Sequence, residues 1–196
     1  MPSPRKLTRA DLMSVEEYAR VRTARRRELV EKKMKRRLEI GPVATVHFES
    51  FDSMWLQVQE MLYIERGGEA QIEDELAAYN PLVPRGDELV ATVMFEIDDP
   101  VRRTAFLSRL GGIEESAFLS FAGETLRGLP EADLDRTTAA GKASSVQFIH
   151  FPFTSAQIAK FRQPGSEVVI GFRHPQYSHV TVMPEAVRAA LSEDFA

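Results

Sequence analysis

The sequence contains no cysteine among its 196 residues. This absence excludes disulfide bonds, catalytic thiolates, zinc sites built on cysteine and iron–sulfur clusters ligated by this chain. No run of the sequence approaches the roughly 20 apolar residues of a membrane-spanning helix. The first residues are polar and basic and lack the apolar segment of a secretory signal. We therefore expect a cytoplasmic protein that does not associate with a membrane.

Standard catalytic and ligand-binding motifs are also missing. The sequence has no GxGxxG, GxSxG or HExxH motif and no EF-hand loop. Gly141-Lys142 does not complete a phosphate-binding loop, because Arg136 and Ala143 replace the leading glycine and the following serine or threonine. These motifs therefore assign no reaction, and whether the protein is an enzyme is left open.

Charge is unevenly distributed along the chain, whose formal net charge is −4. Residues 1–37 hold 13 Lys and Arg against 5 Asp and Glu, whereas the remaining residues hold 12 against 24. The sequence favours a basic helical arm over residues 1–38, followed by one α+β domain over residues 39–196. Segments of opposite charge attract each other within one chain or between two copies, so we expect a homodimer.

The basic arm carries the signals of a helix start. Ser14 precedes Glu17 by three positions, as in a capping box, and a helix is predicted from Ser14 to about Leu38. Its apolar stripe consists of Val15, Tyr18, Leu29, Met34 and Leu38.

The fold class follows from short apolar strands that do not alternate regularly with helices. This pattern favours an α+β fold with a mainly antiparallel or mixed sheet of five to six strands. The predicted strands cover Val43–Glu49, Leu89–Ile97, Ala117–Ala122, Ser145–Phe153, Glu167–His174 and Val180–Met183.

A helix predicted over Ser53–Arg66 contains the only tryptophan and is apolar on most sides. Such a helix is usually buried, and we expect it to be the central helix on which the sheet packs. At about 100° per residue, Glu65 lies within its apolar arc and Glu60 lies opposite. A buried carboxylate has a raised pKa and is a candidate general acid or base. Alternatively, Glu65 ends the helix and reaches solvent or an arginine.

The four histidines are candidate metal ligands together with these carboxylates. Imidazole and carboxylate groups are common ligands of zinc and other transition metals. No two of the candidates have a diagnostic spacing, and a histidine on its own is more often a hydrogen-bonded structural residue than a metal ligand. The candidate set is His47, Glu60, Glu65, His150, His174 and His179.

Five segments together resemble a bacterial family classified as a domain of unknown function, family 3501. They are KLTRADLMSVEEY, QVQEMLYIER, ELAAYNPLVP, SSVQFIHFPF and GFRHPQY, and the resemblance covers Lys6 to about Leu191. The family has no established activity, so the resemblance assigns no catalytic residue. It implies a gene neighbourhood with rubrerythrin-like and iron–sulfur proteins, and hence a role in redox chemistry or peroxide response.

Three functions follow in order of preference. The first is an accessory protein that binds a protein partner, in the redox context implied by the resemblance. The second is a metal- or small-molecule-binding protein that uses the histidine and glutamate candidates. The third is nucleic-acid binding through the basic residues between Arg25 and Arg37. The acidic remainder of the chain makes the third the least favoured.

Overall fold

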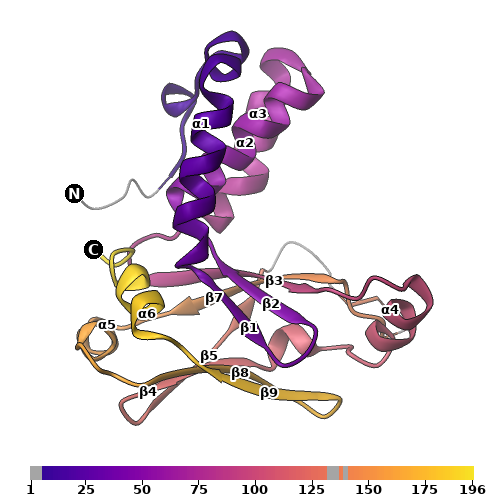
Figure 1. Ribbon diagram of the computed structural model, residues 1–196, viewed down its shortest axis with the longest axis vertical. Helices are drawn as coiled ribbons and strands as arrows, with labels where there is room; N and C mark the ends of the chain where they lie inside the picture. The colour runs from indigo at the N-terminus through magenta and orange to yellow at the C-terminus, as the bar shows by residue number, and fades with distance from the viewer. Residues whose placement is uncertain (1–5, 132–136, 139–140) are drawn as a thin grey trace.

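The computed structural model describes residues 6–131, 137–138 and 141–196 and has an α+β fold (Figure 1). Its described strands form two antiparallel sheets, which we call sheet A and sheet B. Sheet A has the order β1-β2-β3-β7-β6, and sheet B has the order β5-β4-β8-β9. The predicted fold class is thus confirmed, but the single sheet of five to six strands is replaced by one sheet of five strands and one of four.

The strands of sheet A are β1 (Arg37–Ile40), β2 (Ala44–Phe48), β3 (Glu88–Phe95), β6 (Leu129–Pro130) and β7 (Val146–Pro152). Those of sheet B are β4 (Ala117–Phe121), β5 (Glu124–Arg127), β8 (Val168–His174) and β9 (Tyr177–Val182). The helices are α1 (Val15–Met34), α2 (Phe51–Glu65), α3 (Gly68–Tyr79), α4 (Pro100–Leu107), α5 (Ser155–Arg162) and α6 (Glu185–Ser192). Short 3-10 turns cover Arg9–Asp11, Asn80–Leu82 and Ile113–Glu115.

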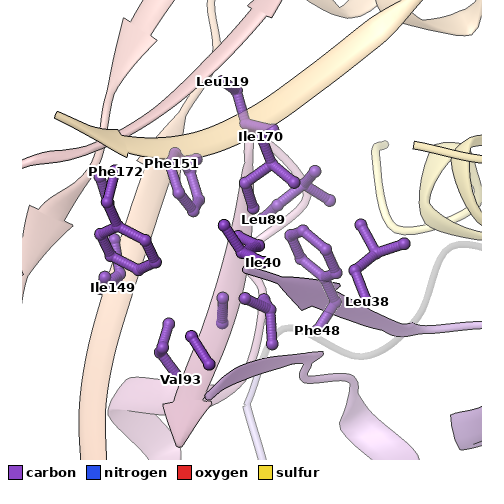
Figure 2. Close-up of a cluster of buried hydrophobic side chains, with 14 of the residues drawn as sticks. Leu38, Ile40, Phe48, Leu89, Val93, Leu119, Ile149, Phe151, Ile170 and Phe172 are labelled. Atoms are coloured by element: carbon purple, nitrogen blue, oxygen red, sulfur yellow. The ribbon is translucent and has the colours of Figure 1, made fainter. Parts of the chain in front are cut away.

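The two sheets pack face to face and enclose the larger hydrophobic core. Alternate residues of β3 point into it, because successive side chains of a strand point to opposite faces. Figure 2 shows how side chains of both sheets meet there. The labelled ones include Phe48, Leu89, Val93 and Ile149 from sheet A and Leu119, Ile170 and Phe172 from sheet B.

A second core lies on the opposite face of sheet A. Val90 of β3 contributes to it, and α2 and α3 supply most of the remaining side chains. The three N-terminal helices stand side by side and project away from the sheets (Figure 1). Other members of this core are Leu7, Met54, Val58, Leu62, Leu76, Leu82 and Val83.

Helix α2 corresponds to the predicted Ser53–Arg66 helix and buries one face in the core on the helical side of sheet A, rather than all of its apolar sides. Met54, Val58 and Leu62 are buried, but Ile64 and Glu65 are exposed at the end of the helix. Two of its aromatic side chains, Trp55 and Tyr63, pack edge-on against a tyrosine of α1, with ring centroids 6.0 Å apart in each case. The apolar surface of α2 thus extends beyond its buried face because it is shared with a neighbouring helix.

Helix α1 starts as predicted and ends earlier. The Ser14 side chain accepts a hydrogen bond from the Glu17 backbone N–H, which completes the capping box. The helix ends at Met34, and Leu38 belongs to β1, where it pairs with Val46 of β2. Within the described parts of the chain, no helix is long and apolar enough to cross a membrane.

Candidate functional site

His150 lies in the most buried polar cluster that includes one of the predicted residues. It points from β7 toward the helical side of sheet A, as does its partner across the ladder, Val90. Its Nδ1 lies 2.9 Å from a carboxylate oxygen of Glu88, and its Nε2 lies 2.7 Å from one of Glu131. Arg85 also donates to Glu88, at 2.9 Å. One imidazole therefore joins two carboxylates.

This arrangement favours the protonated form of His150. Burial opposes the charge, but the hydrogen bonds and negative charges of Glu88 and Glu131 outweigh it and raise the pKa of His150. Burial likewise opposes the Glu88 charge, yet His150 and Arg85 lower the pKa of Glu88. Both ring nitrogens are used within the chain, so the imidazolium has no free nitrogen with which to bind a metal.

Glu60 is held in the contact between α1 and α2. Both of its carboxylate oxygens accept hydrogen bonds of 2.8 Å from the Arg22 guanidinium, and one also accepts a 2.6 Å bond from the Tyr18 hydroxyl. The hydrogen bonds from Arg22 outweigh burial and lower the pKa of Glu60. Glu60 thus serves as the ionic link between two helices in this structure.

Glu65 is exposed at the end of α2 and accepts a 2.8 Å hydrogen bond from the Gln71 side chain. Glu65 is therefore not a carboxylate buried in the apolar arc, and the alternative of a solvent-reaching residue at the helix end describes it. The helical periodicity placed Glu65 on the apolar arc. However, α2 ends at Glu65, and its last residues, Ile64 and Glu65, are exposed.

His47 lies on the helical side of sheet A, two strands from His150. Its Nδ1 is buried and has no hydrogen-bond partner among the residues that the structure describes. Burial is the main cause that lowers the pKa of His47, and the positive charge of Lys33 adds to it. Because neighbouring strands lie about 4.8 Å apart, the backbone positions of His47 and His150 are about 10 Å or more apart.

The two remaining histidines have local structural contacts. His174 accepts a hydrogen bond at Nδ1 from the Gln176 backbone N–H and donates one from Nε2 to the Gly111 carbonyl, at 3.2 and 3.1 Å. The His179 ring packs on Tyr177 with centroids 4.5 Å apart. Both interactions order the turn and the edge of sheet B.

The six predicted ligands are therefore spread over both sheets and α2. In the described ranges, no group of three or more His, Asp or Glu side chains is arranged to hold a metal ion. The metal hypothesis stays a prediction, which metal analysis of protein purified without added metal tests directly.

Sequence reasoning missed the exposed apolar residues of α1. Met34 was assigned to the buried stripe, yet it is 73% exposed, and Val30 one turn earlier is 58% exposed. Tyr18 and Leu29 of the predicted stripe are buried. Val30 lies four positions before Met34 and so neighbours it on the helix surface, which is the signal that identifies this pair.

Basic residues surround this pair, and one of them, Arg26, also contributes positive charge that lowers the pKa of Glu60 after the larger effects of Arg22, burial and Tyr18. Arg26 and Arg27 precede Val30 by one turn, and Lys33 follows it by three positions. None of the three forms an ion pair or side-chain hydrogen bond with another residue in the portions of the chain described. We call these five residues, Arg26, Arg27, Val30, Lys33 and Met34, the α1 face.

Comparison with known proteins places the chain within a family of undetermined activity. The family described as "Protein of unknown function (DUF3501)" matches residues 6–195. A crystal structure of a novel protein of unknown function from Burkholderia pseudomallei K96243 is 36% identical, with a TM-score of 0.90. The match covers 97% of this chain and 100% of that one. No curated protein matches the sequence.

Proposed function

Because this chain belongs to the DUF3501 family of proteins of unknown function, we propose a function from its own surface: it is an accessory protein that binds an acidic protein partner through the α1 face. The single observation that supports this proposal is the exposure of Val30 and Met34 side by side, next to three cations that form no ion pair with the residues that the structure describes. Exposed apolar side chains rimmed by polar ones are typical of protein interaction sites.

Charge defines the class of partner. Arg26, Arg27 and Lys33 are free to attract carboxylates of a second protein, and complementary charge increases the rate and the specificity of association. Two α1 faces repel each other, so a second copy of this chain is a poor occupant of this surface. The partner we expect presents an acidic helix or loop with one or two apolar side chains.

Nucleic-acid binding would use the same cations but would not account for the two exposed apolar side chains. Phosphate backbones require positive charge and make no use of exposed Val30 and Met34. The cytoplasmic location and the redox or peroxide context belong to the same proposal. They rest on the composition and on the family resemblance respectively, and identification of the partner tests both.

Site-specific photocrosslinking in the native cells tests this function. A benzophenone side chain introduced at Met34 is expected to crosslink one acidic protein, whereas the same group at Val101 of α4, which is 77% exposed, is not. The double variant Val30→Glu, Met34→Glu loses co-purification of that protein, while Val101→Glu retains it. Burying two such side chains contributes about 1.5 kcal/mol or more each, so we expect a loss of affinity of about a hundredfold or greater.

Two results contradict the proposal. One is equal crosslinking from Met34 and Val101, because that outcome means that the α1 face makes no specific contact. The other is a crosslinked product that nuclease treatment removes, which favours nucleic-acid binding instead.

A further inference from the structure

The outer face of sheet B forms the lower boundary of the molecule in Figure 1. In β8, Val168, Ile170 and Phe172 point into the core between the sheets. The intervening Val169 and Gly171 point outward, because side chains alternate along a strand. On the adjacent β9, Val180 and Val182 point the same way and are 60% and 58% exposed.

Gly171 keeps this face flat. A Cβ atom built on Gly171 would lie 2.7 Å from Cγ1 of Val180 and 2.5 Å from the His179 carbonyl oxygen. Val180 is opposite Gly171 in the ladder, so its side chain lies across the space that the glycine leaves open. The result is a low apolar surface of three valines, which suits close packing against another sheet.

Opposite charges flank the valines on the same row. Arg173 follows Gly171 by two positions within β8 and so is on the outer face, and the exposed Glu167 lies immediately before β8, two positions before Val169. Neither side chain forms an ion pair or hydrogen bond with the residues described. The Arg173 guanidinium lies 4.1 Å from the centroid of the Phe118 ring, which holds it in place and leaves its N–H donors free.

We infer that the outer face of sheet B binds a second copy of this chain in a two-fold symmetric dimer. A two-fold axis near the centre of the row reverses the strand direction, so Glu167 of each copy meets Arg173 of the other. The valines then pack against their equivalents. A two-fold interface requires a self-complementary surface, and this row carries a negative charge at one end and a positive charge at the other. The inference uses no residue of the α1 face and does not depend on the proposed function.

The area available predicts a reversible dimer. Four strands about 4.8 Å apart and a row of six residue steps give a surface of roughly 20 Å by 20 Å. Such an area is small beside the roughly 800 Å² per partner of a typical stable interface. We therefore expect monomer and dimer to exchange with concentration.

Sedimentation equilibrium of the full chain over a wide concentration range tests the dimer. Glu167→Arg or Arg173→Glu alone converts both symmetry-related contacts into like-charge contacts and is expected to weaken dimerisation by about tenfold or more. The combined Glu167→Arg, Arg173→Glu variant exchanges the charges and is expected to restore it. Val101→Glu, on a distant helix, serves as the control and leaves the dimer unchanged.

Restoration by the double variant is the decisive result, since loss of structure cannot produce it. Circular dichroism of each variant checks that the fold is retained. A wild-type chain that stays monomeric at all concentrations overturns the inference. So do single reversals that leave the dimer intact, or a folded double variant that fails to recover it.

Discussion

Replacing His150 with glutamine tests the interpretation of the buried cluster on sheet A. The imidazole sits 2.9 Å from Glu88 and 2.7 Å from Glu131, and both carboxylates are largely buried. Removing the shared cation leaves these carboxylates without their main partner. Breaking a buried ion pair in this way costs about 3 kcal/mol or more, because the remaining charge is uncompensated. Glutamine donates to one carboxylate, so we expect a loss near the lower limit, about 3 kcal/mol.

The effect of pH on this difference gives a sharper test. The raised pKa of His150 means that its stabilisation is fully present below its unfolded value of 6.5 and is lost as the pH rises through the folded pKa. The lowered pKa of Glu88 means that its contribution is present above 4.5 and is lost as the pH falls through its folded pKa. The free energy of unfolding of the wild type should therefore exceed that of the glutamine variant by the largest amount between about pH 4.5 and 6.5. The difference should become smaller as the pH rises further.

Urea unfolding at several pH values measures this difference as a change in midpoint at constant slope. His174→Gln is the matched control, because His174 is partly exposed and its two hydrogen bonds are to uncharged backbone groups of Gln176 and Gly111. Its cost should stay within about 0.5 kcal/mol at every pH. A difference between wild type and His150→Gln that is flat with pH, or that widens above pH 7, would refute the assignment of a charged imidazole.

Two further substitutions test the packing of the helices and of the sheet edges by urea unfolding. Glu60→Gln breaks the bidentate contact with Arg22 and should cost about 1 to 2 kcal/mol, while Glu65→Gln should cost less than about 0.5 kcal/mol; equal losses would contradict the assigned contacts. Gly41→Ala places a Cβ 2.6 Å from the His179 ring at a φ of 66° and should cost about 2 kcal/mol or more. Gly123→Ala has a φ of 77° but open space, so its smaller loss measures the backbone strain alone, and a loss as large as that of Gly41→Ala would argue against the clash.

Local signals in the sequence predicted much of the secondary structure. The capping residue Ser14 marks the start of α1, and its side chain forms the expected bond with the backbone N–H three positions later. The alternation of apolar residues in β3 predicted the face that enters the large core. These features depend on residues within one turn or one strand, so a single sequence contains the information needed to identify them.

The arrangement of α2 depended on partners that the local pattern does not specify. Its apolar sides predicted burial, but Trp55 and Tyr63 obtain their contacts from Tyr18 of α1, more than 30 positions earlier. The short strands β5 and β6 likewise take their places through pairing with β4 and β7. Such contacts are set by the topology, and they divided the expected single sheet into two.

The predicted site residues failed to converge for a related reason. A sequence identifies residue types with useful chemistry but does not show which neighbours already use it. Glu60 and His150 are both engaged by residues distant in the chain, Arg22 and Glu88 respectively. The signal that was available and unused was the pairing of Val30 with Met34 at helical spacing among arginines.

Part of the positive charge of the N-terminal segment is neutralised by ion pairs within the molecule. Cations of the N-terminal segment pair with carboxylates of α2, α3 and the C-terminal residues, as the opposite signs of arm and body suggested. The pairs are Arg9–Glu69, Arg22–Glu60, Lys32–Asp52 and Arg36–Asp194. The cations of the α1 face form no such ion pair with any residue that the structure describes, which is the basis for proposing that they contact a second protein. If neutralising Arg26, Arg27 and Lys33 together left partner binding unchanged, this surplus would have no role in recognition.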